Sequence, residues 1–182
     1  MASESGFVWT LLQSFSLANN ALFKGKPFGN DFPMNRESNY VNWSSYRLSL
    51  PQMQAIANHS THFRATCNFP TEGLQYADYA RAKLEDHDIF GTWQYTCRMY
   101  QYINIRENEC SNCSAMTKQL PGQSWTVNSY RSRSFNCQFD GTPGANGSEH
   151  NFGRYLKINA NHRCSSSPNS TTQYWLGVKK DS

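Results

Sequence analysis

Apolar and polar residues alternate along two stretches in the middle of the chain, and this alternation predicts two β-strands. Over residues 62–69 the odd-numbered positions are apolar and the even-numbered positions are polar. The same period of two runs over residues 95–106, with an apolar set of Cys97, Met99, Ile103 and Ile105. A period of two is that of a strand with one buried and one solvated face. Both strands point a cysteine inward, so a Cys67–Cys97 bridge across neighbouring strands is among the fifteen pairings that six cysteines permit.

Two flanking segments add regular structure to these strands. Residues 7–17 are dense in β-forming side chains and predict a strand, whereas residues 19–46 are broken by glycine and proline and predict an irregular excursion. A short helix is expected over residues 50–58, capped by Ser49 and with Pro51 in its first turn.

The last third of the chain predicts a long ordered loop. Glycine and asparagine leave little regular structure between residues 139 and 155. Cys137 and Cys164 hold the ends of this segment, whether or not they pair with each other.

Composition narrows the class of fold. Apolar residues make up 38% of the 182 residues, aromatic residues 14% and charged residues only 16%. This profile favours a loop-rich β or α+β domain over a helical bundle, and one domain of this length buries roughly 70% of its unfolded surface. The formal charge of +4 is too small for a dense phosphate-binding stripe, so we expect no nucleic-acid partner.

Cysteine content indicates the compartment. An even number of cysteines suits an oxidising environment, in which thiols close into bridges: Cys67, Cys97, Cys110, Cys113, Cys137 and Cys164. Five Asn-x-Ser/Thr motifs add weak support, because about three arise by chance at this composition. Glycosylation is expected at Asn42, Asn58, Asn146 and Asn169, but not at Asn112 if the adjacent Cys113 is bridged.

The N-terminal residues have no basic region followed by an unbroken apolar stretch, so we identify no signal peptide. No run of eighteen apolar residues occurs, so no transmembrane helix and no membrane insertion is expected. We therefore expect the chain to be a piece of a longer secreted or membrane-anchored protein, rather than a cytosolic protein with reduced thiols.

Candidate chemistry is sparse. The five histidines accompany no Gly-x-Ser-x-Gly motif and no acids on converging segments, so we expect no enzyme. Cys110 and Cys113 have the spacing of a zinc knuckle, and His162 and Cys164 are the residues that could complete such a zinc site. We instead expect each of the two cysteines to form a structural disulfide with a different partner. Four aromatic residues are candidates to stack on a sugar ring, although packing is their commoner role: Trp93, Tyr95, Tyr100 and Tyr102.

Several short motifs carry a family resemblance. Gly6-Phe7-Val8-Trp9-Thr10-Leu11-Leu12 resembles the Gly-Trp-Thr-Leu strand of fibrinogen-like C-terminal domains and intelectin lectins, and Asn42-Trp43-Ser44-Ser45-Tyr46 resembles their Trp-x-x-Tyr segment. The remaining motifs are most similar to cnidarian extracellular and coral skeletal organic matrix proteins: Tyr102-Ile103-Asn104-Ile105-Arg106, Asn151-Phe152-Gly153, His162-Arg163-Cys164-Ser165-Ser166 and Thr171-Thr172-Gln173-Tyr174-Trp175.

The resemblance implies a fibrinogen-like α+β fold, stabilised by disulfides: a twisted, mainly antiparallel sheet with short helices and long ordered loops. It covers residues 6–177 as a single domain, with residues 1–5 and 178–182 as tails. The small cysteine-containing subdomain that begins such domains is missing ahead of Gly6.

Calcium is the cofactor that the resemblance raises. In place of the family's Asp-x-Asp loop this chain has residues 140–151, where Asp140 and Glu149 are the only acids. With Asn146, Asn151 and backbone carbonyls they offer a charge-poor site of low affinity. The simpler hypothesis is a turn-rich loop whose Asp and Asn side chains satisfy their own backbone.

Our leading functional hypothesis is a non-catalytic extracellular recognition module that binds a glycan or protein ligand through loop 140–164. The expected ligand-binding residues are Asp140, Asn146, Glu149, His150, Asn151, Arg154 and His162. The alternative is a structural protein of an extracellular or biomineral matrix, and a weaker one is a cytosolic zinc or thiol protein. The sequence predicts neither ligand identity nor oligomeric state.

Overall fold

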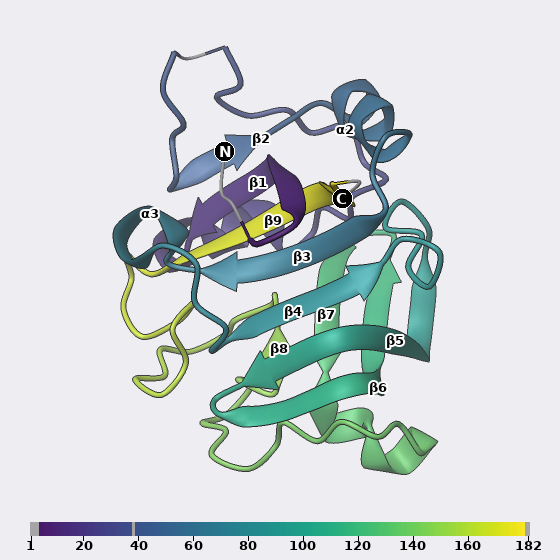
Figure 1. Ribbon diagram of the computed structural model, residues 1–182. Helices are drawn as coiled ribbons and strands as arrows, with labels where there is room; N and C mark the ends of the chain where they lie inside the picture. Colours follow the sequence, from purple (N-terminus) through teal and green to yellow (C-terminus); the bar gives the residue numbers. More distant parts are fainter. Residues whose placement is uncertain (1–3, 38, 181–182) are drawn as a thin grey trace.

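The computed structural model describes residues 4–37 and 39–180, and within these residues the chain forms one twisted nine-stranded sheet (Figure 1). The strands lie in the order β2-β1-β9-β3-β4-β5-β6-β7-β8, and all neighbours are antiparallel. Their bounds are β1 Phe7–Ser16, β2 Ser45–Arg47, β3 His62–Cys67, β4 Tyr79–Lys83, β5 Trp93–Ile105, β6 Asn108–Leu120, β7 Gln123–Asn128, β8 Asn151–Phe152 and β9 Thr171–Lys179.

Helices are short in the described part of the chain. The α-helices are α1 Asn20–Phe23, α2 Leu50–Ala57 and α3 Phe69–Glu72, and the single 3-10 turns are Leu17–Asn19, Ser129–Arg131 and Arg133–Phe135. Ser49 caps α2 as predicted, because its Oγ accepts a hydrogen bond from the Gln52 backbone while the Gln52 side chain accepts one from the Ser49 backbone at 3.1 Å. Met53 is the fully buried residue of this helix.

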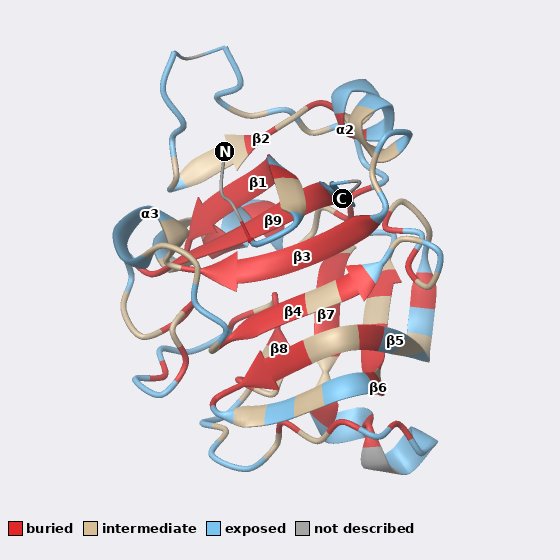
Figure 2. Ribbon diagram, viewed as in Figure 1, coloured by how far each residue is buried: buried red, intermediate tan, exposed pale blue. Residues whose placement is uncertain are grey.

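The two ends of the described chain pair in the sheet interior, β1 against β9. A β-bulge between Leu11 and Gln13 shifts the register of β1. Because an extra residue exchanges the two faces of a strand, Trp9 and Leu11 pack in a small cluster with Trp175, whereas Phe15 packs in the main core. Aromatic clusters therefore cover both faces of the sheet here, and β1, β9 and β3 are almost wholly buried (Figure 2).

The prediction that one face of β3 is exposed to solvent is wrong, because all six residues of this strand are buried. Arg64 is the clearest case: its guanidinium lies 4.4 Å from the Trp9 ring and 5.0 Å from the Trp175 ring, and it pairs with Glu4 at 3.2 Å. β3 lies between β9 and β4, and the N-terminal segment covers its polar face. Alternation identifies two faces of a strand but not what covers the polar one.

The predicted inward face of β5 is correct only in its second half. Ile103 and Ile105 are buried, but Cys97 and Met99 are exposed and Tyr100 lies in the core instead. The pairing with β4 spans only residues 102–104 of β5, so the first half of this strand extends beyond β4 and pairs with β6 alone. Tyr100 is at an even-numbered position and Ile103 at an odd-numbered one, so the alternation of buried and exposed side chains shifts by one residue between them.

Three disulfides join the six cysteines: Cys67–Cys164, Cys97–Cys137 and Cys110–Cys113. The Cys67–Cys97 bridge, one of the fifteen possible pairings, does not form, because β4 separates β3 from β5 and the two strands are not neighbours. Cys110 and Cys113 pair with each other within β6 rather than with different partners. Asn112 between them has a φ of 49°, in the left-handed region that asparagine tolerates.

A thiol count tests the pairing directly. Protein made in an oxidising compartment and labelled under denaturing conditions is expected to show no free thiol before reduction, and all six after it. Mass spectrometry of the peptides assigns the three pairs. Six reactive thiols in unreduced protein would contradict both the disulfide framework and the extracellular hypothesis.

The coarse fold prediction is confirmed: the described chain is a mostly antiparallel sheet with a few short helices, stabilised by disulfides. The expected tails are partly wrong, since Glu4 is buried and β9 runs to Lys179; residues 1–3 and 181–182 lie outside the described residues. Within the described residues, no helix has the length and apolarity needed to cross a membrane.

Candidate functional site

Loop 140–164 has little regular structure, as predicted for residues 139–155, and it is anchored to the sheet from both sides. It has one short strand, β8, which pairs with the end of β7. Cys137, just before the loop, is bridged to β5, and Cys164 at its end is bridged to the last residue of β3. These links join segments that are 40 and 97 residues apart in sequence.

Arg106 holds the start of the loop from inside. It lies in the turn between β5 and β6 with a φ of 52°, and its side chain is buried. The guanidinium donates to the backbone carbonyls of Gly141 and Glu149, nitrogen Nη2 to the first and Nη1 to the second. Burial lowers the pKa of Arg106, and the carboxylates of Asp78 and Glu149 act in the opposite direction.

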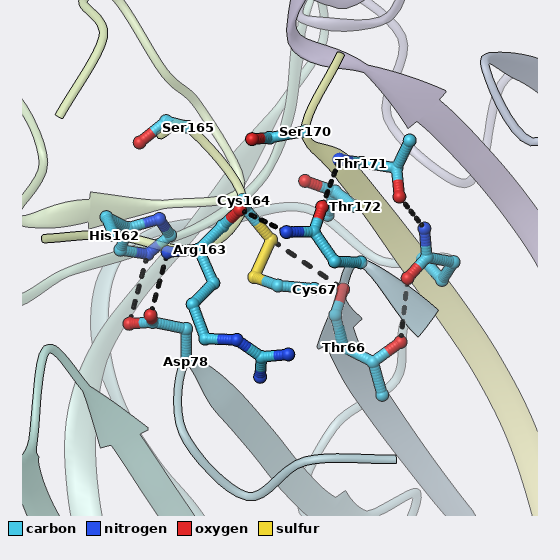
Figure 3. Close-up of a disulfide and its surroundings, with 12 residues drawn as sticks. Thr66, Cys67, Asp78, His162, Arg163, Cys164, Ser165, Ser170, Thr171 and Thr172 are labelled. Atoms are coloured by element: carbon cyan, nitrogen blue, oxygen red, sulfur yellow. Dashed lines mark hydrogen bonds and ion pairs between the residues drawn. A yellow bond between two sulfur atoms is a disulfide. The ribbon is translucent and has the colours of Figure 1, made fainter. Parts of the chain in front are cut away.

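Asp78 joins this turn to the end of the loop. One carboxylate oxygen accepts from the Arg106 backbone N–H at 2.8 Å, and the other accepts from the Arg163 backbone N–H at 2.9 Å. Figure 3 shows Asp78 facing His162 and Arg163, beside the Cys67–Cys164 bridge. A single buried carboxylate thus fixes two segments that sequence analysis did not connect.

His162 lies between two carboxylates. Its Nε2 is 3.6 Å from Asp78 Oδ1 and its Nδ1 is 3.6 Å from Glu149 Oε2, while Ser165 donates to the same Glu149 oxygen at 2.6 Å. Burial raises the pKa of Glu149 to about 7 and lowers the pKa of His162 to about 4. Between these values Glu149 keeps its proton and His162 is neutral, so neither of these two side chains carries a charge.

This arrangement does not fit a calcium ion bound between Asp140 and Glu149. Calcium takes six to eight oxygen ligands, several of them from carboxylates. Glu149 points into the interior toward Ser165 and His162, and Asp140 accepts from the Thr142 backbone at 3.0 Å as a local turn. The Arg106 guanidinium already contacts the carbonyls of Gly141 and Glu149, which are the kind of ligand a cation would use.

The remaining expected ligand-binding residues lie nearer the surface. Asn146 is exposed, and Asn151 and Arg154 are half-buried. His150 is half-buried with its ring 5.2 Å from that of Tyr130, and burial lowers its pKa. The loop therefore separates its predicted site residues: Glu149 and His162 meet in the interior, while the other five, including Asp140, lie wholly or partly at the surface.

The zinc hypothesis finds no free thiolate among the described residues. The one group of three or more His, Cys, Asp or Glu ligand atoms close enough to hold a metal there is Cys67, His162 and Cys164, and its two cysteines form a disulfide. Cys110 and Cys113 are likewise oxidised. Zinc needs deprotonated thiols, which a disulfide does not supply.

Of the four aromatic candidates for sugar stacking, Trp93 and Tyr100 are buried, and Tyr95 and Tyr102 are half-buried. Sequence analysis missed Tyr76, a residue that is 48% exposed and whose ring lies edge-on to that of Tyr102 at a centroid distance of 6.2 Å. No periodicity marks Tyr76, because it lies in the connection before β4.

Comparisons of the chain with protein-family models, curated proteins and solved structures find no match. The resemblance to fibrinogen-like domains therefore stays a prediction from short motifs, and function has to be argued from the site itself.

Proposed function

We propose that the protein is a non-catalytic extracellular recognition module that binds a glycan or a protein ligand through loop 140–164. The three disulfides support an oxidising environment. The anchoring of the loop by Arg106, Asp78 and two bridges supports a preformed surface, which binds without a large cost of ordering.

The observation that carries the proposal is an exposed tip on this anchored loop, defined by Leu156, Lys157 and Ile158, in which two apolar side chains flank a lysine. Leu156 is 58% exposed and Ile158 is 54% exposed, although their neighbours Tyr155 and Asn159 are buried. The tip borders a hollow of about 370 Å³, whose other wall comes from Leu17 and the α1 region. Adjacent exposed apolar side chains on fixed backbone favour a protein ligand for this surface.

The test is binding of the full chain to an array of extracellular proteins and glycans. The double variant Leu156→Ser/Ile158→Ser is expected to lower affinity for the captured ligand by about tenfold or more, since it removes the apolar contact. Val41→Ser, at another exposed apolar position, is the matched control and is expected to bind normally. Binding is also expected to persist in chelator, because Arg106 and not a metal holds the loop.

Two results would count against the proposal. If the array captures nothing, the structural-matrix alternative becomes the better account. If a ligand is captured with unchanged affinity by the double variant, recognition takes place elsewhere on the molecule. Loss of binding in chelator would instead restore a metal-dependent site.

A further inference from the structure

A second surface of interest lies on strands β3 to β6, where the pairing of the strands places four side chains side by side. Arg64 of β3 lies opposite Arg81 of β4, Arg81 lies opposite Tyr102 of β5, and Tyr102 lies opposite Ser111 of β6. Directly paired residues project from the same face, so these four side chains form one row across four strands.

One end of this row is closed and the other is open. Arg64 is fully buried between the Trp9 and Trp175 rings. Arg81, Tyr102 and Ser111 border a hollow of about 600 Å³, in the size range of small-ligand sites. Figure 2 shows the same contrast, since β3 is drawn buried throughout, whereas the first half of β6 is largely exposed or intermediate.

Tyr76 supplies an aromatic wall to this hollow. The residue is 48% exposed, yet its neighbours fix its position. The hydroxyl donates to Glu4 at 3.3 Å, and the ring packs edge-on against Tyr79 at 5.2 Å and Tyr102 at 6.2 Å. An exposed ring held by its edges offers a flat apolar face to a ligand.

Polar groups surround this face. The Gln101 side-chain oxygen accepts from Arg81 Nε at 3.1 Å, which leaves the amide N–H groups of Gln101 without a partner among the described residues. The side chains of Ser111 and Asn112, both exposed, are likewise unpaired within that part of the chain. The hollow therefore combines an aromatic face with uncharged donors and acceptors.

The formal charges that line and flank the hollow sum to zero, because the two arginines Arg64 and Arg81 are matched by the two carboxylates of Glu4 and Glu109. Arg81 pairs with Glu4, a buried carboxylate that also binds Arg64 and Tyr79. On the other side, the Tyr102 hydroxyl donates to Glu109 at 2.8 Å. An anionic ligand would have to compete with Glu4 for Arg81, so these charges favour an uncharged ligand.

We propose that this hollow, the Tyr76 pocket, binds a neutral saccharide. The apolar face of a sugar ring stacks on Tyr76, and its hydroxyl groups exchange hydrogen bonds with Gln101, Ser111 and Asn112. This site is independent of the apolar tip at Leu156 and Ile158.

The test is a glycan array that carries neutral hexose and N-acetylhexosamine oligosaccharides beside sialylated and sulfated ones. The full chain is expected to bind neutral saccharides, and calorimetry with the best of them is expected to show an affinity at least tenfold lower for Tyr76→Ala. Tyr130→Ala is the matched control, because Tyr130 is 59% exposed on a different segment, and it is expected to bind as the wild type does.

A Gln101→Ala variant provides a second, polar probe and is expected to weaken binding while Tyr76 stays in place. Circular dichroism of each variant checks the fold. Absence of neutral-saccharide binding, binding of acidic glycans alone, or equal affinities for Tyr76→Ala and Tyr130→Ala would each overturn the proposal. Leu156→Ser/Ile158→Ser is expected to leave saccharide binding unchanged, so failure of one site is distinguishable from failure of the other.

Discussion

Replacing Cys67 and Cys164 together by alanine is expected to lower the free energy of unfolding by about 4 to 5 kcal/mol. The bridge joins residues 97 apart in sequence, and cross-linking a loop of this length removes much entropy from the unfolded chain. It also fixes the end of loop 140–164 beside α3, where the Asn68 side chain donates to the Arg163 carbonyl at 3.0 Å. Urea unfolding of oxidised proteins measures the change.

The matched control is the double variant Cys110→Ala/Cys113→Ala. That bridge joins residues only three apart, and the same relation between loop length and entropy gives roughly 2 kcal/mol for its removal. The Cys67–Cys164 variant is therefore expected to unfold at the lower urea concentration. Equal midpoints, or the reverse order, would show that loop closure does not set the contribution of these bridges.

Local pattern predicted the local parts of this fold. The helix at Leu50–Ala57 begins and caps as expected because Ser49, Pro51 and Gln52 act within one turn. The strand Phe7–Ser16 ends within one residue of the prediction, since β-forming side chains mark it directly. Both features depend on residues adjacent in sequence.

Long-range pairing decided what the pattern could not predict. The polar side of β3 is buried because Glu4 and the rings of Trp9 and Trp175 cover Arg64, and none of these residues is near it in sequence. The partner of Cys67 depends on β4 lying between β3 and β5, an order that alternation does not specify. For the same reason, the sequence could not specify which cysteines pair with each other.

The candidate site likewise has features that the sequence predicted and contacts that depend on residues far apart in sequence. The loop and its cysteine anchors were expected from composition, but the inward turn of Glu149 depends on His162 and Ser165. Arg106 appeared in the sequence only as part of a motif, and its contact with the loop needs the β5–β6 turn to place it there. An acid in a glycine-rich loop therefore does not by itself distinguish a metal ligand from a buried structural group.

Acid is expected to destabilise the protein mainly through His87. This side chain is fully buried, with its ring 4.7 Å from that of Tyr100 and its Nε2 3.0 Å from the Met99 carbonyl oxygen. Burial lowers the pKa of His87 to about 4, from an ordinary value of 6.5. Between these pH values the unfolded chain binds the extra proton, so stability falls as pH falls through this window.

Glu149 and His162 contribute little to the loss of stability in acid, because the pKa of Glu149 is raised by folding and the pKa of His162 is lowered. The folded pair keeps one proton on Glu149, whose pKa is raised to about 7, while His162, with a pKa lowered to about 4, is neutral. The unfolded pair between pH 4.5 and 6.5 also holds one proton, on His162 instead. Equal proton numbers in the two states give no net dependence on pH. The lowered pKa values of His62 and His150 act in the same direction as that of His87.

His87→Gln is therefore expected to flatten the acid limb of the stability curve. Unfolding by urea at pH 7 and pH 4.5, in the presence of chelator, measures how much free energy of unfolding each protein loses between the two pH values. The wild type is expected to lose roughly 2 to 3 kcal/mol more than His87→Gln over this interval, because the variant has no imidazole to protonate. His59→Gln, at an exposed position just after α2, is the control and is expected to keep the wild-type slope. If His87→Gln and the wild type lose equal stability over this interval, the buried imidazole of His87 is not the acid-sensitive group.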